Sequence, residues 1–284
     1  MAGGPLTTAQ ALAGGLGDDD LAIIDCRFHI PEPERGEAAY LEGHIPGAVY
    51  AHLDRDLSGP MTGTNGRHPL PSVDRMTERF SAWGIDETAR VVVYDDAGGQ
   101  YAARLWWMLR FLGHARVTLL DGGIPAWQAG PGELRAGREE RPRRDFTPRH
   151  RPDMTVAAAS VEQYLLVDAR AGARFRGETE PLDPVAGHIP GARNHPTSAN
   201  LDEKGRFLAP DTLRRLFDGV LGTTRIESVV SYCGSGVTAC HNLLAMEIAG
   251  LPGARLYPGS WSEWCSDPQR GVETGNGAAE DSKG

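Results

Sequence analysis

The sequence has few cysteines and no long apolar run, and each absence excludes a class of protein. Its 284 residues include four cysteines, too few for a disulfide scaffold, and no Cys-x-x-C pair of the kind that binds structural zinc. No run approaches the about 18 apolar residues of a membrane-spanning helix. The first residues, Met-Ala-Gly-Gly-Pro, form neither a basic nor an apolar stretch, so we expect no signal peptide and a reducing, cytoplasmic location.

Positive charge is also in deficit. The chain has 29 Lys and Arg against 38 Asp and Glu, a formal net charge of −9, which argues against nucleic acid as a partner. An anionic substrate would therefore need a site that is locally positive. The rest of the composition, 40% hydrophobic and 24% charged, is that of a globular protein, and the length allows about two domains.

The chain carries an internal repeat. Four landmarks occur twice in the same order: Asp-x-Arg at 25–27 and 168–170, Gly-His-Ile-Pro-Gly-Ala at 43–48 and 187–192, a strand pattern at 91–95 and 229–233, and a turn followed by Trp at 120–127 and 257–264. Such a series indicates a tandem duplication. In each copy short apolar strands alternate with amphipathic segments, as in the predicted strand 90–94, helix 101–112 and strand 114–120. This alternation predicts an α/β fold in which each copy is a mainly parallel sheet flanked by helices.

The repeat also predicts the domain boundaries. We expect a non-catalytic domain at 6–130, a catalytic domain at 154–270, a linker at 131–153 and a flexible tail at 271–284. The linker is rich in arginine, which we interpret as a solvated segment lying on a more acidic domain surface, in preference to a binding patch.

The two copies differ at the residue that follows the second strand pattern. The first copy has Asp95 there and the second has Cys233, followed by Gly-Ser-Gly-Val-Thr. A glycine-rich loop before a helix can turn several backbone N–H groups inward, which would favour a thiolate and stabilise an anion on its sulfur. We therefore predict that Cys233 is a nucleophile. The alternative is an inert cysteine at the end of a core strand.

Two other uses of a reactive cysteine fit the sequence poorly. A cysteine phosphatase needs an arginine six residues after the nucleophile to clamp phosphate, and that position is Ala239. A papain-like protease needs a histidine close to the thiol, whereas His241 stands two helical turns beyond the start of the loop. We interpret Cys240 and His241 as helix-packing residues.

The paired Asp-x-Arg and Gly-His-Ile-Pro-Gly-Ala motifs, with Cys-Gly-Ser-Gly-Val-Thr-Ala in the second copy alone, resemble the tandem rhodanese-domain sulfurtransferases. The resemblance covers about residues 21–264, and the cysteine loop is most similar to that of the 3-mercaptopyruvate sulfurtransferases. It implies two tandem rhodanese-like domains, with catalysis in the C-terminal one and no metal or organic cofactor.

The resemblance also implies roles for individual residues. Cys233 would accept the sulfur, and Gly234, Ser235, Gly236, Val237 and Thr238 would form its cradle. Arg174 matches an arginine that holds the substrate carboxylate. Ser235 matches a loop serine that is backed by a histidine and an aspartate of the N-terminal domain, here His68 and Asp54.

The sequence departs from the family in one stretch. A second substrate arginine is expected shortly before the second Gly-His-Ile-Pro, but residues 181–186 read Pro-Leu-Asp-Pro-Val-Ala. Either another cation, such as Arg67 or Arg176, supplies the charge, or the affinity for carboxylate is weaker.

These residues predict a ping-pong sulfur transfer through a Cys233 persulfide. The donor is a small sulfur-bearing anion, with 3-mercaptopyruvate preferred over thiosulfate, and the acceptor is cyanide or a thiol such as thioredoxin or glutathione. One alternative is a thiosulfate sulfurtransferase proper. Another is a carrier or redox sensor in which the modified Cys233 is itself the signal.

Overall fold

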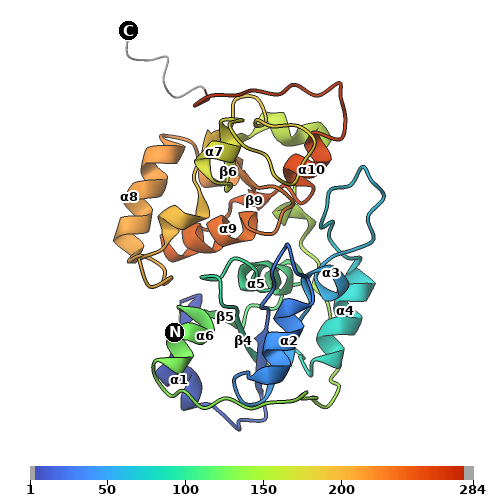
Figure 1. The fold of residues 1–284 in the computed structure, drawn as a ribbon, viewed down its shortest axis with the longest axis vertical. Coiled ribbons are helices and arrows are strands. Elements are labelled where there is room, and N and C mark those ends of the chain that lie inside the picture. Colours follow the sequence, from blue (N-terminus) through green and yellow to red (C-terminus); the bar gives the residue numbers. More distant parts are fainter. Residues whose placement is uncertain (1–3, 278–284) are drawn as a thin grey trace. The chain divides into compact units, whose positions relative to one another are not determined.

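The computed structural model describes residues 4–277, and the chain divides into two compact units (Figure 1). The first unit holds the chain up to Gly59, Leu70–Arg151 and the short piece Asp202–Phe207. The second holds Pro60–Pro69, Pro152–Leu201 and the chain from Leu208 onward. Each unit therefore includes a short segment that lies, in sequence, within the other half. In the described part of the chain no helix has the length and apolar character needed to cross a membrane.

The first unit contains five strands and six α-helices among its described residues. The strands are β1 (Leu6–Thr7), β2 (Leu21–Asp25), β3 (Ala48–Tyr50), β4 (Arg90–Tyr94) and β5 (Val117–Leu120). The helices are α1 (Ala9–Ala13), α2 (Arg35–Glu42), α3 (Leu53–Asp56), α4 (Val73–Ala82), α5 (Ala102–Phe111) and α6 (Gly123–Gln128). Side chains define several of these ends: the Ser72 hydroxyl, for example, accepts the Arg75 N–H at the start of α4.

The second unit repeats the pattern with shorter elements. Its described strands are β6 (Leu165–Asp168), β7 (Arg193–Asn194), β8 (Val229–Tyr232) and β9 (Arg255–Leu256). Its α-helices are α7 (Gly172–Phe175), α8 (Pro210–Leu221), α9 (Ala239–Ile248) and α10 (Ser260–Trp264). Short 3-10 turns occupy Pro152–Met154, Ala158–Gln163, Thr197–Asn200 and Ile226–Ser228.

The two sheets share one topology. The strand order is β1-β5-β4-β2-β3 in the first unit and β7-β6-β8-β9 in the second, so the two orders match once β1 is set aside. All strand pairs within these sheets are parallel. The predicted α/β fold of two duplicated, helix-flanked parallel sheets is therefore confirmed. The register pairs Asp25 with Tyr94 and Asp168 with Tyr232, which places Asp95 and Cys233 just beyond the carboxyl edge of each sheet.

The repeated motifs form the same internal network in both units. The Arg27 guanidinium binds the Asp25 carboxylate at 2.6 Å and also donates to the Gly43 carbonyl. Arg170 repeats both contacts, with Asp168 and with the Gly187 carbonyl. All four charged side chains are buried, so each ion pair is compensated inside the core. The Asp-x-Arg motif thus connects an inner strand of each sheet, β2 or β6, to the Gly-His-Ile-Pro loop. The motif is duplicated because both units need this structural contact.

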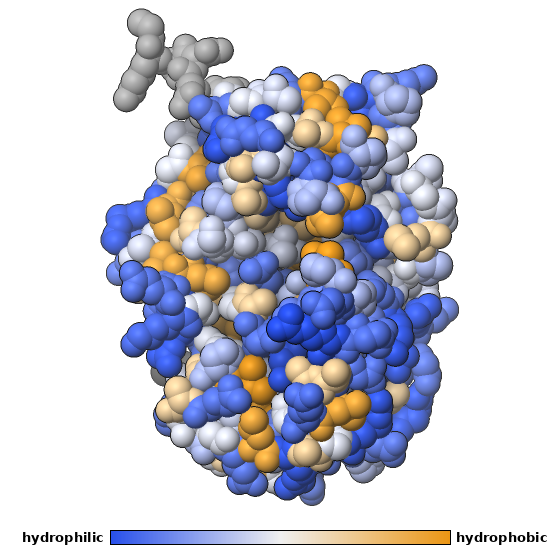
Figure 2. Space-filling view, in the orientation of Figure 1, coloured by the Kyte–Doolittle hydropathy of each residue, from blue (hydrophilic) through white to orange (hydrophobic). Residues whose placement is uncertain are grey.

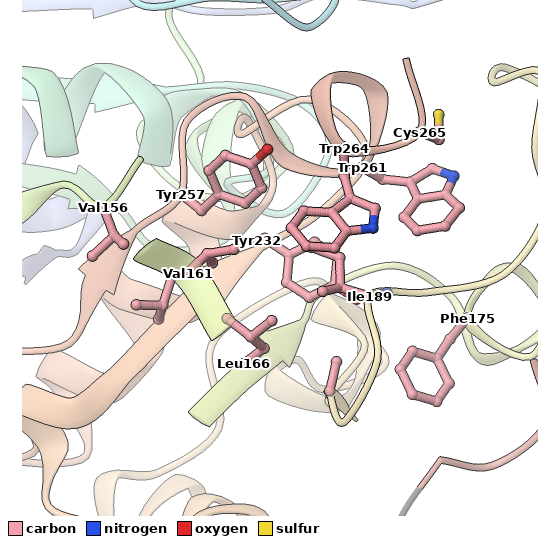
Figure 3. Packing of buried hydrophobic residues seen from close by; sticks show 12 residues of the cluster. Val156, Val161, Leu166, Phe175, Ile189, Tyr232, Tyr257, Trp261, Trp264 and Cys265 are labelled. Carbon is pink, nitrogen blue, oxygen red and sulfur yellow. The ribbon is translucent and has the colours of Figure 1, made fainter. Parts of the chain in front are cut away.

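Each unit has a hydrophobic core that includes the tryptophan at the end of the repeat, Trp127 or Trp264. In the second unit the cluster gathers aromatic residues from α10 and the strands, including Trp261, Trp264 and Tyr232 (Figure 3). In the first unit Trp127 packs with Tyr94 and the apolar residues of β2 and β4. The indole N–H groups of Trp127 and Trp264 both donate to a backbone carbonyl, of Glu133 and Gly271 respectively. Burial of such large side chains is worth about 1.5–3 kcal/mol each.

The arginine-rich segment after the first repeat pairs with acidic side chains of the first unit. Arg138 binds Glu37 at 2.6 Å, Arg143 binds Glu78 at 2.7 Å and Arg144 binds Asp86 at 3.3 Å.

On the face drawn in Figure 2, apolar side chains form scattered patches between hydrophilic ones.

Part of the predicted tail forms backbone hydrogen bonds with the second unit. Glu273 forms a backbone bridge with His188, and the Gly275 N–H donates to the Arg176 carbonyl. The segment 271–277 therefore contacts the second unit. Residues 278–284 of the predicted tail lie outside the described part of the chain.

Candidate active site

Cys233 stands between the end of β8 and the start of α9, in a loop we call the cradle loop (residues 233–238). Its Sγ accepts a hydrogen bond from the Gly236 N–H at 3.2 Å, and its own N–H donates to the Ser260 Oγ at 3.1 Å. The residue is only 2% exposed. A backbone donor aimed at sulfur favours negative charge there, as a nucleophilic or sulfur-bearing cysteine requires.

The glycines of the cradle loop are required by close contacts. Gly236 has φ +76°, and a Cβ on it would lie 2.2 Å from the Pro258 carbonyl oxygen. A Cβ on Gly234 would lie 2.8 Å from Arg67 Nη2 and 3.4 Å from Arg174 Nη2. A side chain at either position would displace a neighbour. The second contact also places two guanidinium groups beside the residue that follows Cys233.

The turn at the start of α10 forms backbone hydrogen bonds with the cradle loop. The Trp261 N–H donates to the Cys233 carbonyl at 3.0 Å and the Ser262 N–H to the Gly234 carbonyl at 2.9 Å. Ser260 has φ +53°, an unfavourable value for a residue with a side chain, and its Oγ both accepts the Cys233 N–H and donates to the Tyr257 carbonyl. Gly123 has φ +57° at the matching turn of the first unit.

Arg174 and Arg67 form the positive side of the site. Arg174 lies on α7 and binds Glu180 at 2.6 Å and Asp183 at 3.4 Å. Arg67 pairs with Asp183, and its backbone N–H donates to Ser262 Oγ at 3.0 Å. Burial lowers the pKa of Arg67, and Arg174 acts in the same direction while the Cys233 side chain opposes it. A guanidinium in this position can bind an anion placed beside the cradle loop.

The structure distinguishes between the two cations considered as replacements for the missing arginine. Arg67 lies beside Gly234, as described above. Arg176 instead forms a two-bond pair with Glu178, at 2.6 and 2.9 Å, on an exposed part of the segment. Arg67 is therefore the second cation of this site.

His68 and Ser235 are brought together as expected: His68 Nδ1 lies 2.7 Å from Ser235 Oγ. His68 belongs to the segment Pro60–Pro69, which clusters with the second unit. Asp54 lies on α3 in the first unit, where its backbone N–H donates to His52 Nδ1. Val237 is buried in the cradle loop, and Thr238 is the residue before α9.

The other three cysteines have the surroundings of structural residues. Burial raises the pKa of Cys26 and of Cys265, which keeps both thiols neutral near pH 7. The Cys240 thiol lies 3.4 Å from the Gly236 carbonyl. His241 is fully buried, with Nδ1 3.2 Å from the Asn200 amide. These contacts agree with helix packing for Cys240 and His241.

The matching loop of the first unit holds a carboxylate in place of a thiol. Asp95 Oδ1 accepts the N–H groups of Ala97 and Gly99, and Oδ2 accepts those of Tyr101 and Ala102, all within 2.8–2.9 Å. Asp95 is fully buried. The first copy of the loop therefore binds an anion with its backbone, and that anion is its own side chain.

Sequence reasoning did not identify Ser260, Ser262, Glu180 or Asp183 as neighbours of the site. A signal for Ser260 existed in the repeat, because it takes the place of Gly123, a glycine with positive φ. The sequence of residues 181–186 shows that an arginine is missing there, but it does not indicate that Asp183 lies beside Arg67 and Arg174.

Comparison with known proteins agrees with this architecture. The rhodanese-like domain model matches residues 8–130 and 154–267. A probable 3-mercaptopyruvate sulfurtransferase of Pseudomonas aeruginosa is 47% identical over 284 residues, covering 97% of this chain and 100% of that protein. A putative thiosulfate sulfurtransferase of Mycobacterium tuberculosis is 42% identical over 278 residues, covering 95% and 97%. The solved 3-mercaptopyruvate sulfurtransferase from Leishmania major is 30% identical with a TM-score of 0.84, covering 93% of this chain and 75% of that one.

The duplicated parallel sheets and the two matched domains define a protein of two rhodanese-like domains. The chain belongs to the rhodanese family, and the resemblance to its tandem-domain sulfurtransferases is confirmed. It is an enzyme of the sulfurtransferase class.

Proposed function

We propose that this enzyme moves a sulfur atom from 3-mercaptopyruvate to a thiol or cyanide through a persulfide on Cys233. The observation that carries the proposal is the position of Cys233. Its sulfur accepts a backbone N–H, and the next residue lies against two guanidinium groups. Such a site can both activate a thiolate and hold an anionic donor beside it.

In the first step the Cys233 thiolate attacks the sulfur of the donor. The S–S bond forms as the C–S bond of 3-mercaptopyruvate breaks, and the electron pair leaves on carbon as the enolate of pyruvate. Arg174 and Arg67 hold the donor carboxylate. Ser235, hydrogen-bonded to His68 at 2.7 Å, supplies or polarises the proton that the enolate takes up.

In the second step the acceptor removes the outer sulfur. A thiolate, such as that of glutathione or thioredoxin, or cyanide attacks the outer sulfur of the persulfide, and the electron pair returns to Cys233 Sγ. The Gly236 N–H and the other backbone groups of Gly234–Thr238 stabilise the negative charge at both stages. The chemistry needs no cofactor, and it suits a reducing compartment such as the cytoplasm.

Thiosulfate is the second candidate donor, with sulfite as the leaving group. The name of the Mycobacterium tuberculosis relative favours it. Against it, the cradle loop carries no Lys or Arg of its own, and the Ser235–His68 pair has no function when sulfite leaves.

The test is whether sulfur passes through Cys233 catalytically. Cys233→Ser should abolish turnover because the alcohol stays neutral, whereas the Cys26→Ser, Cys240→Ser and Cys265→Ser controls should retain most activity. Mass spectrometry of the wild type after donor alone should find one added sulfur on the peptide that contains Cys233. Comparable loss in a control variant would indicate another nucleophile or a relay thiol. A wild type that stalls after one equivalent of donor would instead be a carrier.

A further inference from the structure

The Asp183 side chain lies between the two arginines of the site. It belongs to the irregular segment that connects α7 to the second Gly-His-Ile-Pro motif, and it is only 3% exposed. Its Oδ1 pairs with Arg67 Nη1, and its Oδ2 lies 3.4 Å from Arg174 Nη2. One carboxylate therefore bridges both guanidinium groups.

These are the same groups that face the cradle loop. Arg67 Nη2 and Arg174 Nη2 are the atoms nearest to the position a Cβ would take on Gly234, the residue after Cys233. The cations that would bind a donor anion beside Cys233 are thus already engaged by a carboxylate of the protein.

Glu180 has a different place in the same cluster. Its carboxylate accepts hydrogen bonds from Arg170 at 3.2 Å and from the backbone N–H groups of Leu182 and Asp183, as well as from Arg174. Arg170 is in turn bound to Asp168 in the core. Glu180 is therefore part of the framework that shapes the segment, whereas the Asp183 side chain bridges the two arginines.

We propose that Asp183 is an internal anion that competes with the sulfur donor for Arg67 and Arg174, and thereby determines which donors the enzyme accepts. A donor carboxylate takes over the arginines as the Asp183 side chain gives way. The remaining negative charge of Asp183 then repels a dianion such as thiosulfate more than a monocarboxylate. This inference rests on the proposed function for its choice of donors.

The kinetic test removes this charge without changing the shape of the side chain. In Asp183→Asn, kcat/KM for thiosulfate should rise about tenfold and that for 3-mercaptopyruvate about threefold or less, mainly through lower KM values. Glu178→Gln is the matched control, because it removes one negative charge from the exposed Arg176 pair of the same segment. It should leave both values unchanged. Asp183→Glu should restore the donor ratio of the wild type.

A second measurement does not depend on turnover. Cys233 is alkylated by neutral iodoacetamide and by anionic iodoacetate. The rate with iodoacetate divided by the rate with iodoacetamide reports the electrostatic potential at its sulfur. This ratio should increase several-fold in Asp183→Asn and stay constant in Glu178→Gln. If the wild type transfers sulfur from neither donor, the proposed function fails, and the alkylation ratio still decides the role of Asp183. An unchanged or smaller ratio in Asp183→Asn, or equal gains with both donors, would overturn the proposal.

Discussion

In the proposed mechanism, the contact between Ser235 and His68 has a role with one of the two donors only. The hydroxyl and the imidazole lie 2.7 Å apart, and Ser235 is 7% exposed. When pyruvate leaves, a carbon must take up a proton, which a serine coupled to a histidine can provide. Sulfite leaves as a stable anion and needs no such group.

Replacement of Ser235 should therefore affect the two donors unequally. In Ser235→Ala, kcat with 3-mercaptopyruvate should fall about a hundredfold, the usual contribution of a positioned acid–base group, while the thiosulfate reaction stays within a few fold. Steady-state rates with both donors measure this directly. Ser266→Ala is the control, because its hydroxyl bonds to the Glu263 carbonyl in α10.

An equal loss with both donors would contradict the proton role. Ser235 would then be a positioning residue of the cradle loop.

At this scale the sequence predicts residues whose chemistry is unusual for their place. Cys233 is identifiable because the repeat puts a carboxylate in the same position, and Gly-Ser-Gly after a core strand packs poorly. The sequence offers Arg67 and Arg176 equally as replacements for the missing arginine. It does not choose between them, because Arg67 belongs to a loop that lies far from Cys233 in the sequence. Asp183 has no signal of its own, because an aspartate followed by a proline is ordinary in a turn.

The cradle loop between β8 and α9 has an equivalent in the first unit, the loop between β4 and α5. The two loops surround different side chains. After β4, four backbone N–H groups donate to the Asp95 carboxylate, those of Ala97, Gly99, Tyr101 and Ala102. After β8, the Gly236 N–H points at the Cys233 thiol. The backbone of a strand-to-helix loop thus provides an anion site in both units, and the residue at its centre determines whether that site serves stability or chemistry.

Asp95 should therefore stabilise the first unit. Asp95→Asn replaces one carboxylate oxygen by an NH₂ group, which cannot accept a hydrogen bond. The two backbone N–H groups that donate to this oxygen are then buried without an acceptor. We expect a loss of about 2–4 kcal/mol in the free energy of unfolding, measured by urea denaturation. The neighbouring Asp96→Asn, at an exposed position, is the matched control and should change the stability by less than about 0.5 kcal/mol. Equal stability of the two variants would show that the four hydrogen bonds do not matter.

Elements with a long apolar pattern are predicted well, and short ones are not. The predicted helix 101–112 is observed at Ala102–Phe111, and the predicted strand 90–94 is β4. The strand predicted at 114–120 starts later, at Val117, because His114 ends the turn after α5, where its N–H donates to the Leu109 carbonyl. Strands of two residues, such as β7 and β9, are too short to show a period and depend on the sheet around them.

At the scale of the whole molecule, the duplication is predicted but the exchanged segments are not. The family model matches 8–130 and 154–267 as continuous stretches. The compact units, however, exchange residues 60–69 and 202–207. The sequence does not indicate this grouping, because nothing in the composition of these two segments shows which core they contact. His68 and Arg67 lie in the first of them, so this exchange supplies two side chains of the candidate site.

Each unit also contains a buried histidine whose titration couples its stability to pH. Burial lowers the pKa of His114 in the first unit and of His195 in the second below the ordinary value of 6.5. The neutral imidazole is therefore favoured in the folded state, while the unfolded chain binds a proton more readily. The stabilisation is present above about pH 6.5 and is lost as the pH falls towards the folded-state values.

We expect the free energy of unfolding to fall in mild acid, and to fall less in a variant that lacks one of these histidines. Between pH 7.5 and 5, the free energy of unfolding of His114→Gln and of His195→Gln should fall less steeply than that of the wild type, by at most about 1.4 kcal/mol per pH unit for each histidine. Urea denaturation at half-unit pH steps measures these slopes. The comparison of slopes isolates the histidines, because the buried carboxylates are unchanged in every variant. A steeper slope in either variant would mean that its imidazole is charged in the folded state.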